Sequence, residues 1–167
     1  MIKNGEIFSG SSDLSEKLNI GINKDKIEFI GSSIPEHKKS IDAEGYIVTP
    51  GFIDLHTHSD ISFLVDPEAD SKLTQGVTFE LVGNCGMSFC APLNSFSKQT
   101  LSDRLSKYDK KIEINWNNFN GWLNVIESNK PTVNIAAQLG HGVLRSYVMG
   151  MEAISATDFK SSDSTCG

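Results

Sequence analysis

Three short apolar segments, separated by patterns of helical spacing, constrain the fold of this chain most. The strand-like segments lie at residues 52–55, 77–83 and 132–141. Residues 67–75 predict a short helix closed by Gly76, and apolar residues recur at helical spacing from Trp116 to Ile126. Because alternating strands and helices form βαβ crossovers, the sequence predicts an α/β fold with a parallel sheet. Residues 101–114 are charged, and we expect a solvated helical insertion there.

The first 49 residues show a different pattern, in which short strands are broken by turns. These strands are expected around residues 7–8, 18–22, 26–31, 41 and 46–48. Residues 23–25 have the composition of a turn, and both flanks alternate polar and apolar residues, as in a half-buried hairpin. The sequence therefore predicts a small β-layer over residues 1–49, followed by the α/β region over residues 50–151.

Composition excludes several classes of protein. The chain has 167 residues, of which 38% are hydrophobic and 22% are charged, as in soluble globular proteins. A net charge of −6 offers no basic surface to phosphate backbones, so we expect no nucleic-acid partner. No apolar run approaches the roughly 20 residues that span a bilayer, and the start lacks the apolar core of a signal peptide. We therefore expect no membrane partner and a cytoplasmic location. The three cysteines, an odd number, argue against a disulfide framework.

The first α/β strand ends in two histidines one residue apart, within the run from Pro50 to Asp60. Side chains alternate faces along a strand, so we expect His56 and His58 on one side and Thr57 on the other. Neutral imidazoles suit Zn²⁺ and similar ions, but a metal site needs three or four ligands. The alternative, two histidines that only flank a strand end, stays open. Asp54 is expected on the histidine face, where its carboxylate would accept hydrogen bonds that orient the histidines.

The other two strands also end in residues that bind metals or move protons. Cys85 lies between Asn84 and Gly86, where a nearby cation would ionise its thiol. A small buried thiol is an equally good interpretation of Cys85 alone. His141 lies between two glycines and could bind substrate, stabilise an oxyanion or hydrogen-bond a neighbouring backbone, with the structural role preferred. In parallel α/β folds the carboxyl ends of the strands carry the chemistry, so these residues are candidates for one site.

Several of these motifs resemble those of the amidohydrolase superfamily. Residues 45–60 resemble its first barrel strand, and the motifs at 74–78, 83–86 and 140–145 narrow the resemblance to the D-aminoacylase branch, the N-acyl-D-amino-acid deacylases. The resemblance runs from residue 1 to about Met151 and covers only the N-terminal portion of the family's pattern. It implies a TIM-like (β/α)₈ barrel with a small β-sandwich that is partly formed by residues 1–49.

The resemblance also implies a metal site and a reaction. Carried over residue by residue, it assigns His56, His58 and Cys85 as ligands of one or two Zn²⁺ ions, with Cys85 in place of a bridging carboxylate. His141 matches a family motif position and is the candidate substrate-binding residue. The implied reaction is metal-dependent hydrolysis of a linear amide in a small molecule, an N-acyl-D-amino acid. The family's catalytic aspartate has no counterpart in this chain, so its catalytic residue stays unknown. Three carboxylates near strand ends are not assigned as a general base: Asp54, Asp60 and Glu80.

The length of the chain limits how much of such a barrel it can form. A (β/α)₈ barrel takes about 250 residues, so we expect residues 50–151 to supply about three of its βα units and to leave a sheet edge open to self-association. Residues 152–167 have little apolar content and are expected to form a disordered or non-family tail. The chain is therefore expected to be an incomplete barrel. The alternative to a hydrolase is a catalytically inactive fragment or a non-enzymatic partner subunit.

Overall fold

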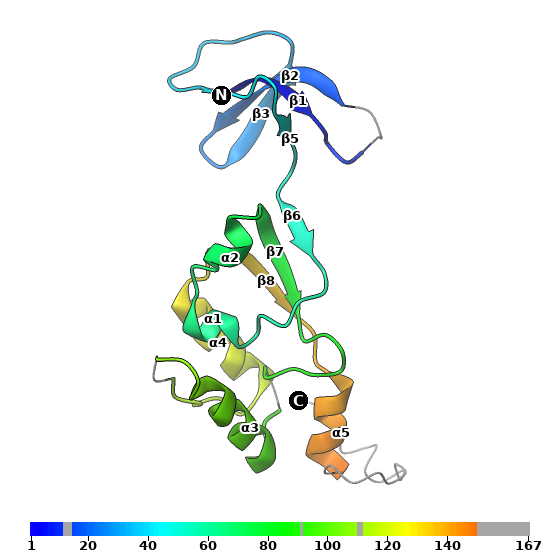
Figure 1. The fold of residues 1–167 in the computed structure, drawn as a ribbon, viewed down its shortest axis with the longest axis vertical. Helices are drawn as coiled ribbons and strands as arrows, with labels where there is room; N and C mark the ends of the chain where they lie inside the picture. Colours follow the sequence, from blue (N-terminus) through cyan, green and yellow to red (C-terminus); the bar gives the residue numbers. More distant parts are fainter. Residues whose placement is uncertain (12–14, 91, 110–111, 150–167) are drawn as a thin grey trace. The chain divides into compact units, whose positions relative to one another are not determined.

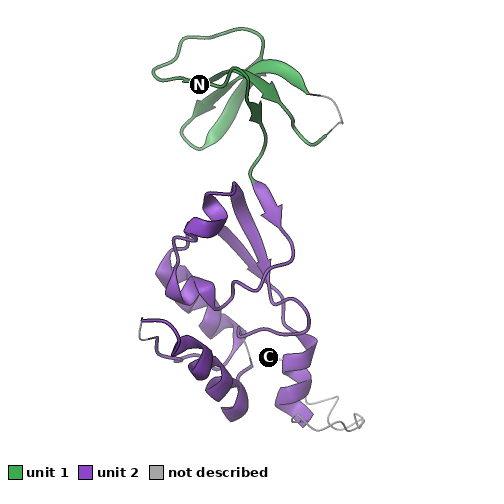
Figure 2. Cartoon of the chain, viewed as in Figure 1, with its two compact units in different colours: residues 1–51 green, residues 52–167 purple. Residues whose placement is uncertain are grey.

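The computed structural model describes residues 1–11, 15–90, 92–109 and 112–149. The chain divides into two compact units, Met1–Gly51 and Phe52–Gly167 (Figure 2). Each unit has a sheet of its own, and the second also carries the helices, so the chain is a mixed α/β structure. The predicted tail at 152–167 lies outside the described residues, as does Cys166.

The first unit is a five-stranded sheet. Its strands are β1 (Ile2–Ile7), β2 (Glu16–Asn23), β3 (Lys26–Gly31), β4 (Ile41–Asp42) and β5 (Ile47–Val48). β2 pairs antiparallel with β1 and β3, while β4 and β5 pair parallel with β1. The predicted hairpin over residues 18–31 is confirmed, and Lys24 takes a positive φ of 55° in its turn. Ile20 and Ala43 are buried, whereas Ile27, Ile41 and Ile47 are more than 60% exposed.

The second unit contains the predicted parallel sheet, with strand order β6-β7-β8 (Figure 1). Its strands are β6 (Phe52–Asp54), β7 (Val77–Val82) and β8 (Asn134–Ala137). The helices are α1 (Ser62–Val65), α2 (Asp70–Leu73), α3 (Ser95–Leu105), α4 (Phe119–Asn129) and α5 (His141–Met149). Helix α1 packs against α4, and α2 packs against β7. This order reproduces the predicted alternation and brings the carboxyl ends of the three strands to one edge of the sheet.

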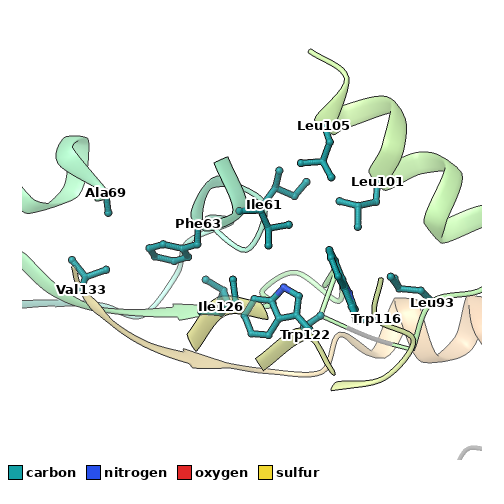
Figure 3. Close-up of a cluster of buried hydrophobic side chains, with 13 residues drawn as sticks. Ile61, Phe63, Ala69, Leu93, Leu101, Leu105, Trp116, Trp122, Ile126 and Val133 are labelled. Atoms are coloured by element: carbon teal, nitrogen blue, oxygen red, sulfur yellow. The ribbon is translucent and has the colours of Figure 1, made fainter. Parts of the chain in front are cut away.

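Helix α4 forms within the segment where apolar residues recur at helical spacing, and it buries two of them, Trp122 and Ile126, in the core of the second unit. It begins after Asn118, whose side-chain oxygen accepts a hydrogen bond from the Gly121 N–H at 2.8 Å. Trp122 is fully buried, and Trp116, which precedes the helix, is 2% exposed. The Trp116 indole N–H donates to the Phe89 carbonyl at 3.1 Å. Figure 3 shows both tryptophans within the cluster of buried side chains.

Two helix predictions were wrong in detail. Helix α3 spans Ser95–Leu105, so the expected solvated helix at 101–114 begins and ends too late. Leu101 and Leu105 are 0% and 4% exposed in the core, because residues four apart share one helix face while the charged residues take the others. The expected helix at 67–75 is only the four residues of α2, since Ala69 before it has a left-handed backbone (φ 52°).

Candidate metal centre

The two histidines follow β6 instead of lying on it. β6 ends at Asp54, and His56 lies in a bend. The alternation of faces nevertheless continues past the strand end, because His56 and His58 are exposed while Thr57 and Ser59 are buried. The two imidazole rings lie with their centroids 5.9 Å apart, at an angle of 69°. Both rings are therefore open to an ion that approaches from solvent.

Cys85 lies beside these rings, in the turn that follows β7. Its Sγ is 3.1 Å from His56 Nε2, and ligand atoms of His56, His58 and Cys85 all lie within 4.8 Å of one another. Cys85 is exposed, which contradicts the interpretation of a buried thiol. The other described cysteine, Cys90, is fully buried, and its thiol lies 3.6 Å from the Gln138 carbonyl. The structure thus separates a solvent-facing thiol in the cluster from a structural one in the core.

The backbone around Cys85 is held in an unusual conformation. Gly83, Cys85 and Gly86 all have positive φ, at 85°, 56° and 72°. Left-handed backbone costs a residue with a Cβ about 1–2 kcal/mol, so Cys85 is locally strained. At Gly83 a Cβ would lie 2.0 Å from the Gln138 carbonyl oxygen, which explains why glycine stands there.

Asn84 ties this turn to the histidine segment. Its side-chain Nδ2 donates to the Thr57 carbonyl at 3.1 Å and to the Leu81 carbonyl at 2.7 Å. Thr57 lies between the two histidines, so the amide fixes the distance between the segments that carry the imidazoles and the thiol. The sequence showed Asn84 beside Cys85 but gave no sign of this bridge, which spans 27 residues.

The donor set fits a zinc ion. Zinc–nitrogen distances of about 2.0–2.1 Å and a zinc–sulfur distance of about 2.3 Å place neighbouring tetrahedral donors roughly 3.5 Å apart. The separations of 3.1 Å for His56 Nε2 to Cys85 Sγ and at most 4.8 Å across the group are close to that spacing. Imidazole and thiolate favour zinc over calcium or magnesium, which prefer oxygen ligands.

Asp54 hydrogen-bonds the backbone of the histidine segment and not the imidazole rings. Its Oδ2 accepts a hydrogen bond from Lys72 Nζ at 2.6 Å, and its Oδ1 accepts one from the His56 backbone N–H at 3.2 Å. The hydrogen bond from Lys72, followed by that from His56, holds the pKa of Asp54 below its ordinary value. The expectation that Asp54 shares the ligand face is therefore corrected, because β6 ends at Asp54 and its side chain turns to α2.

The other two carboxylates near strand ends are deeply buried. Asp60 is 3% exposed, and burial raises the pKa of its carboxyl although Oδ2 accepts the Phe89 N–H at 2.9 Å. Glu80 on β7 is fully buried, and neither of its carboxylate oxygens has a hydrogen-bond partner among the described residues. Lys72 Nζ lies 3.8 Å from Glu80 Oε2. Neither carboxylate belongs to the ligand group.

His141 is exposed at the start of α5 and is not a member of the three-residue ligand group. The glycines beside it have a clear packing role. A Cβ on Gly140 would lie 2.6 Å from the Gly86 carbonyl oxygen, and one on Gly142 would lie 2.7 Å from it. The Val143 N–H donates to the same oxygen at 3.2 Å. Helix α5 therefore packs its first turn directly against the Cys85 turn, while substrate binding by His141 stays a prediction.

Comparison with known proteins identifies the family of the chain. The sequence profile of the amidohydrolase family matches residues 39–159, so the chain belongs to the amidohydrolase family. Within that family, the similarity is to the D-aminoacylase branch. The chain is 33% identical to D-aminoacylase from Alcaligenes xylosoxydans xylosoxydans over 160 residues, which are 95% of this chain and 32% of that relative.

Solved structures agree with this assignment. N-acyl-D-glutamate deacylase from Bordetella bronchiseptica, complexed with zinc and a phosphonate inhibitor, matches with a TM-score of 0.79 at 28% identity and covers 98% of this chain and 34% of that chain. A D-aminoacylase structure that addresses the role of a binuclear metal centre matches with a TM-score of 0.76 at 29% identity, over 95% of this chain and 33% of that chain. The chain thus spans about a third of the length of these relatives. None of the helices in the part of the chain that the structure describes has the length and hydrophobicity of a transmembrane span.

Proposed function

We propose that this chain supplies part of the metal centre of a zinc-dependent amidohydrolase that acts on N-acyl-D-amino acids. The observation that carries the proposal is the convergence of two imidazoles and one thiol within 4.8 Å at the carboxyl edge of a parallel sheet. The sheet would be the first part of a (β/α)₈ barrel, and the first unit would form part of a small β-sandwich. Relatives that are deacylases of N-acylated D-amino acids support the choice of substrate class.

His56, His58 and Cys85 would hold one or two zinc ions in this proposal. When bound to such donors, zinc polarises an amide carbonyl and supplies an activated water near neutral pH. The chain's own residues would bind the zinc and orient its ligands. The two imidazoles are exposed and lie beside the thiol, Asn84 sets the spacing between the two segments, and Thr57 between the histidines is buried. The described residues present no carboxylate in the ligand group, so no general base is assigned to this chain.

The metal content of the purified chain tests this proposal. The wild-type chain is expected to retain zinc after gel filtration, measured by mass spectrometry, and Cys85→Ala and His56→Ala are expected to lose it. Cys90→Ala and His37→Ala are matched controls, because Cys90 is a buried thiol outside the cluster and His37 lies in the first unit. Hydrolysis of N-acetyl-D-amino acids by the zinc-loaded chain tests the activity separately. A wild-type chain without zinc would contradict the metal centre.

A second candidate function is that of a subunit that associates with another chain. The observation that favours it is the exposed apolar edge of the sheet, where β6 has one strand neighbour in the described sheet. Phe52, Ile53 and Leu55 are 56%, 64% and 63% exposed there. An exposed apolar edge strand is a template for further pairing. Light scattering on the purified chain tests association between copies of this chain, and a monomer at all concentrations would contradict it.

A further inference from the structure

We propose that Lys72 is a positioning residue for the metal ligands, which it orients from the buried side of the histidine segment. This inference rests on the proposed metal centre. Lys72 lies on α2, fifteen residues after Thr57. Its ammonium donates to Asp54 Oδ2 at 2.6 Å and to Thr57 Oγ1 at 3.2 Å. One side chain therefore contacts the residue that ends β6 and the residue between the two histidines.

Both contacts act on the residues that carry the imidazoles. The Asp54 carboxylate, held by Lys72, accepts the His56 backbone N–H at 3.2 Å through its other oxygen. The Thr57 hydroxyl, which Lys72 also holds, hydrogen-bonds the Ser59 hydroxyl at 2.7 Å. Thr57 and Ser59 are buried and alternate with the exposed histidines. Hydrogen bonds anchored on Lys72 thus fix the backbone of the ligand segment and so the direction of both rings.

The burial of Glu80 explains why a lysine is needed at this place. Asp54 and Glu80 are register partners on the neighbouring strands β6 and β7, and like charges directly opposite each other are destabilising. Glu80 is fully buried and its oxygens have no hydrogen-bond partner among the described residues, and burying a carboxylate in this way is costly unless a cation lies nearby. Lys72 Nζ lies 3.8 Å from Glu80 Oε2 and 2.6 Å from Asp54 Oδ2. The Lys72 ammonium therefore lies close to two carboxylates and also donates a hydrogen bond to Thr57.

The test must separate positioning from stability, because Lys72→Met alone leaves Glu80 without a cation. The double variant Lys72→Met/Glu80→Leu removes the ammonium together with the buried Glu80 carboxylate, and apolar replacement of such a pair is often neutral or stabilising. The Asp54 carboxylate that remains is 29% exposed and keeps its contact with solvent. Lys72→Arg keeps the charge as the conservative variant. Lys17→Met is the matched control, since it removes an exposed lysine–carboxylate pair (Lys17 to Glu44, 3.3 Å) in the first unit.

Zinc affinity, measured by competition with a chromophoric chelator, and thermal unfolding in EDTA are followed for each variant. Lys72→Met and the double variant are expected to bind zinc about 10–100-fold more weakly, the usual effect of removing a residue that orients metal ligands. The double variant is expected to unfold near the wild-type temperature, Lys72→Arg to keep most of the affinity, and Lys17→Met to match wild type. Cobalt spectra of the double variant should show altered d–d bands.

Three results would overturn the inference, and they have different meanings. Wild-type zinc affinity and an unchanged cobalt spectrum in a folded double variant would show that Lys72 has only a structural role, and would leave the metal centre intact. A wild-type chain that binds no zinc would contradict the metal centre itself and, with it, the role of Lys72. Weaker binding in the Lys17→Met control to the same extent would also contradict it.

Discussion

Cys85 gives the most direct link between backbone strain and metal binding. Its φ of 56° lies in the left-handed region, where a residue with a Cβ pays about 1–2 kcal/mol relative to glycine. Glycine in turn loses about 0.4–1 kcal/mol more conformational entropy on folding than alanine. Cys85→Gly should therefore be about 0.5–1 kcal/mol more stable than Cys85→Ala when no metal is present. Both variants lack the thiol, so their difference isolates the strain at this position.

Urea and thermal unfolding in EDTA, followed by circular dichroism, measure this difference. For a chain of this size it corresponds to about 1–4 °C in Tm. With zinc at 100 times its Kd, the wild-type chain should gain about 2.7 kcal/mol, while neither Cys85 variant should gain as much. The same pair of substitutions at Lys24 (φ 55°) in the β2–β3 turn is the control: the glycine variant should be favoured there too, without any effect on zinc. A Cys85→Gly chain less stable than Cys85→Ala in EDTA would refute the argument from strain.

Three further predictions concern packing and pH. Gly83→Ala should unfold at much lower urea than Gly10→Ala, because the new Cβ meets the Gln138 oxygen at 2.0 Å, whereas a Cβ on Gly10 meets no described atom within 4 Å beyond its chain neighbours. Equal midpoints would contradict this. Leu101→Ala should cost about 2–5 kcal/mol in urea unfolding, since Leu101 is fully buried, and a loss under 1 kcal/mol would refute its core role. Asp42 has a lowered pKa through hydrogen bonds from Asn4 and the Glu44 backbone, so its stabilising effect should be present above its ordinary pKa of 3.8 and vanish as pH falls through the lower pKa of the folded state. Asp42→Asn should remove that part of the acid sensitivity in a pH series of unfolding curves.

The sequence predicted what depends on local periodicity. The parallel order of β6, β7 and β8 followed from the alternation of strand and helix patterns, and the hairpin over residues 18–31 followed from turn composition. Leu101 was misjudged because the charged residues around it dominate the composition, although two leucines four apart suffice to bury one helix face. Helix α2 was overextended because a left-handed alanine such as Ala69 has no signal in a sequence.

The ligand candidates were visible in the sequence, but the residues that support them were not. The spacing of His56 and His58 and the motif around Cys85 predicted three side chains that the structure brings within 4.8 Å. Lys72 and Asn84 had no such pattern. Their contacts depend on where α2 and the turn after β7 come to lie, across 15 and 27 residues of chain.

The two supporting side chains meet at a single residue that is not a ligand. Asn84 donates to the Thr57 carbonyl at 3.1 Å, and Lys72 donates to the Thr57 hydroxyl at 3.2 Å. One contact comes from the segment that holds the strained Cys85, and the other from the ammonium that lies 3.8 Å from the buried Glu80 carboxylate. Each is a local cost that neighbouring contacts must offset, as is common at functional sites. Because Asn84 holds the Thr57 carbonyl and Lys72 holds the Thr57 hydroxyl, the backbone between the two histidines cannot shift without breaking one of these hydrogen bonds. These two contacts give a physical reason why the backbone that carries both imidazoles is held in place.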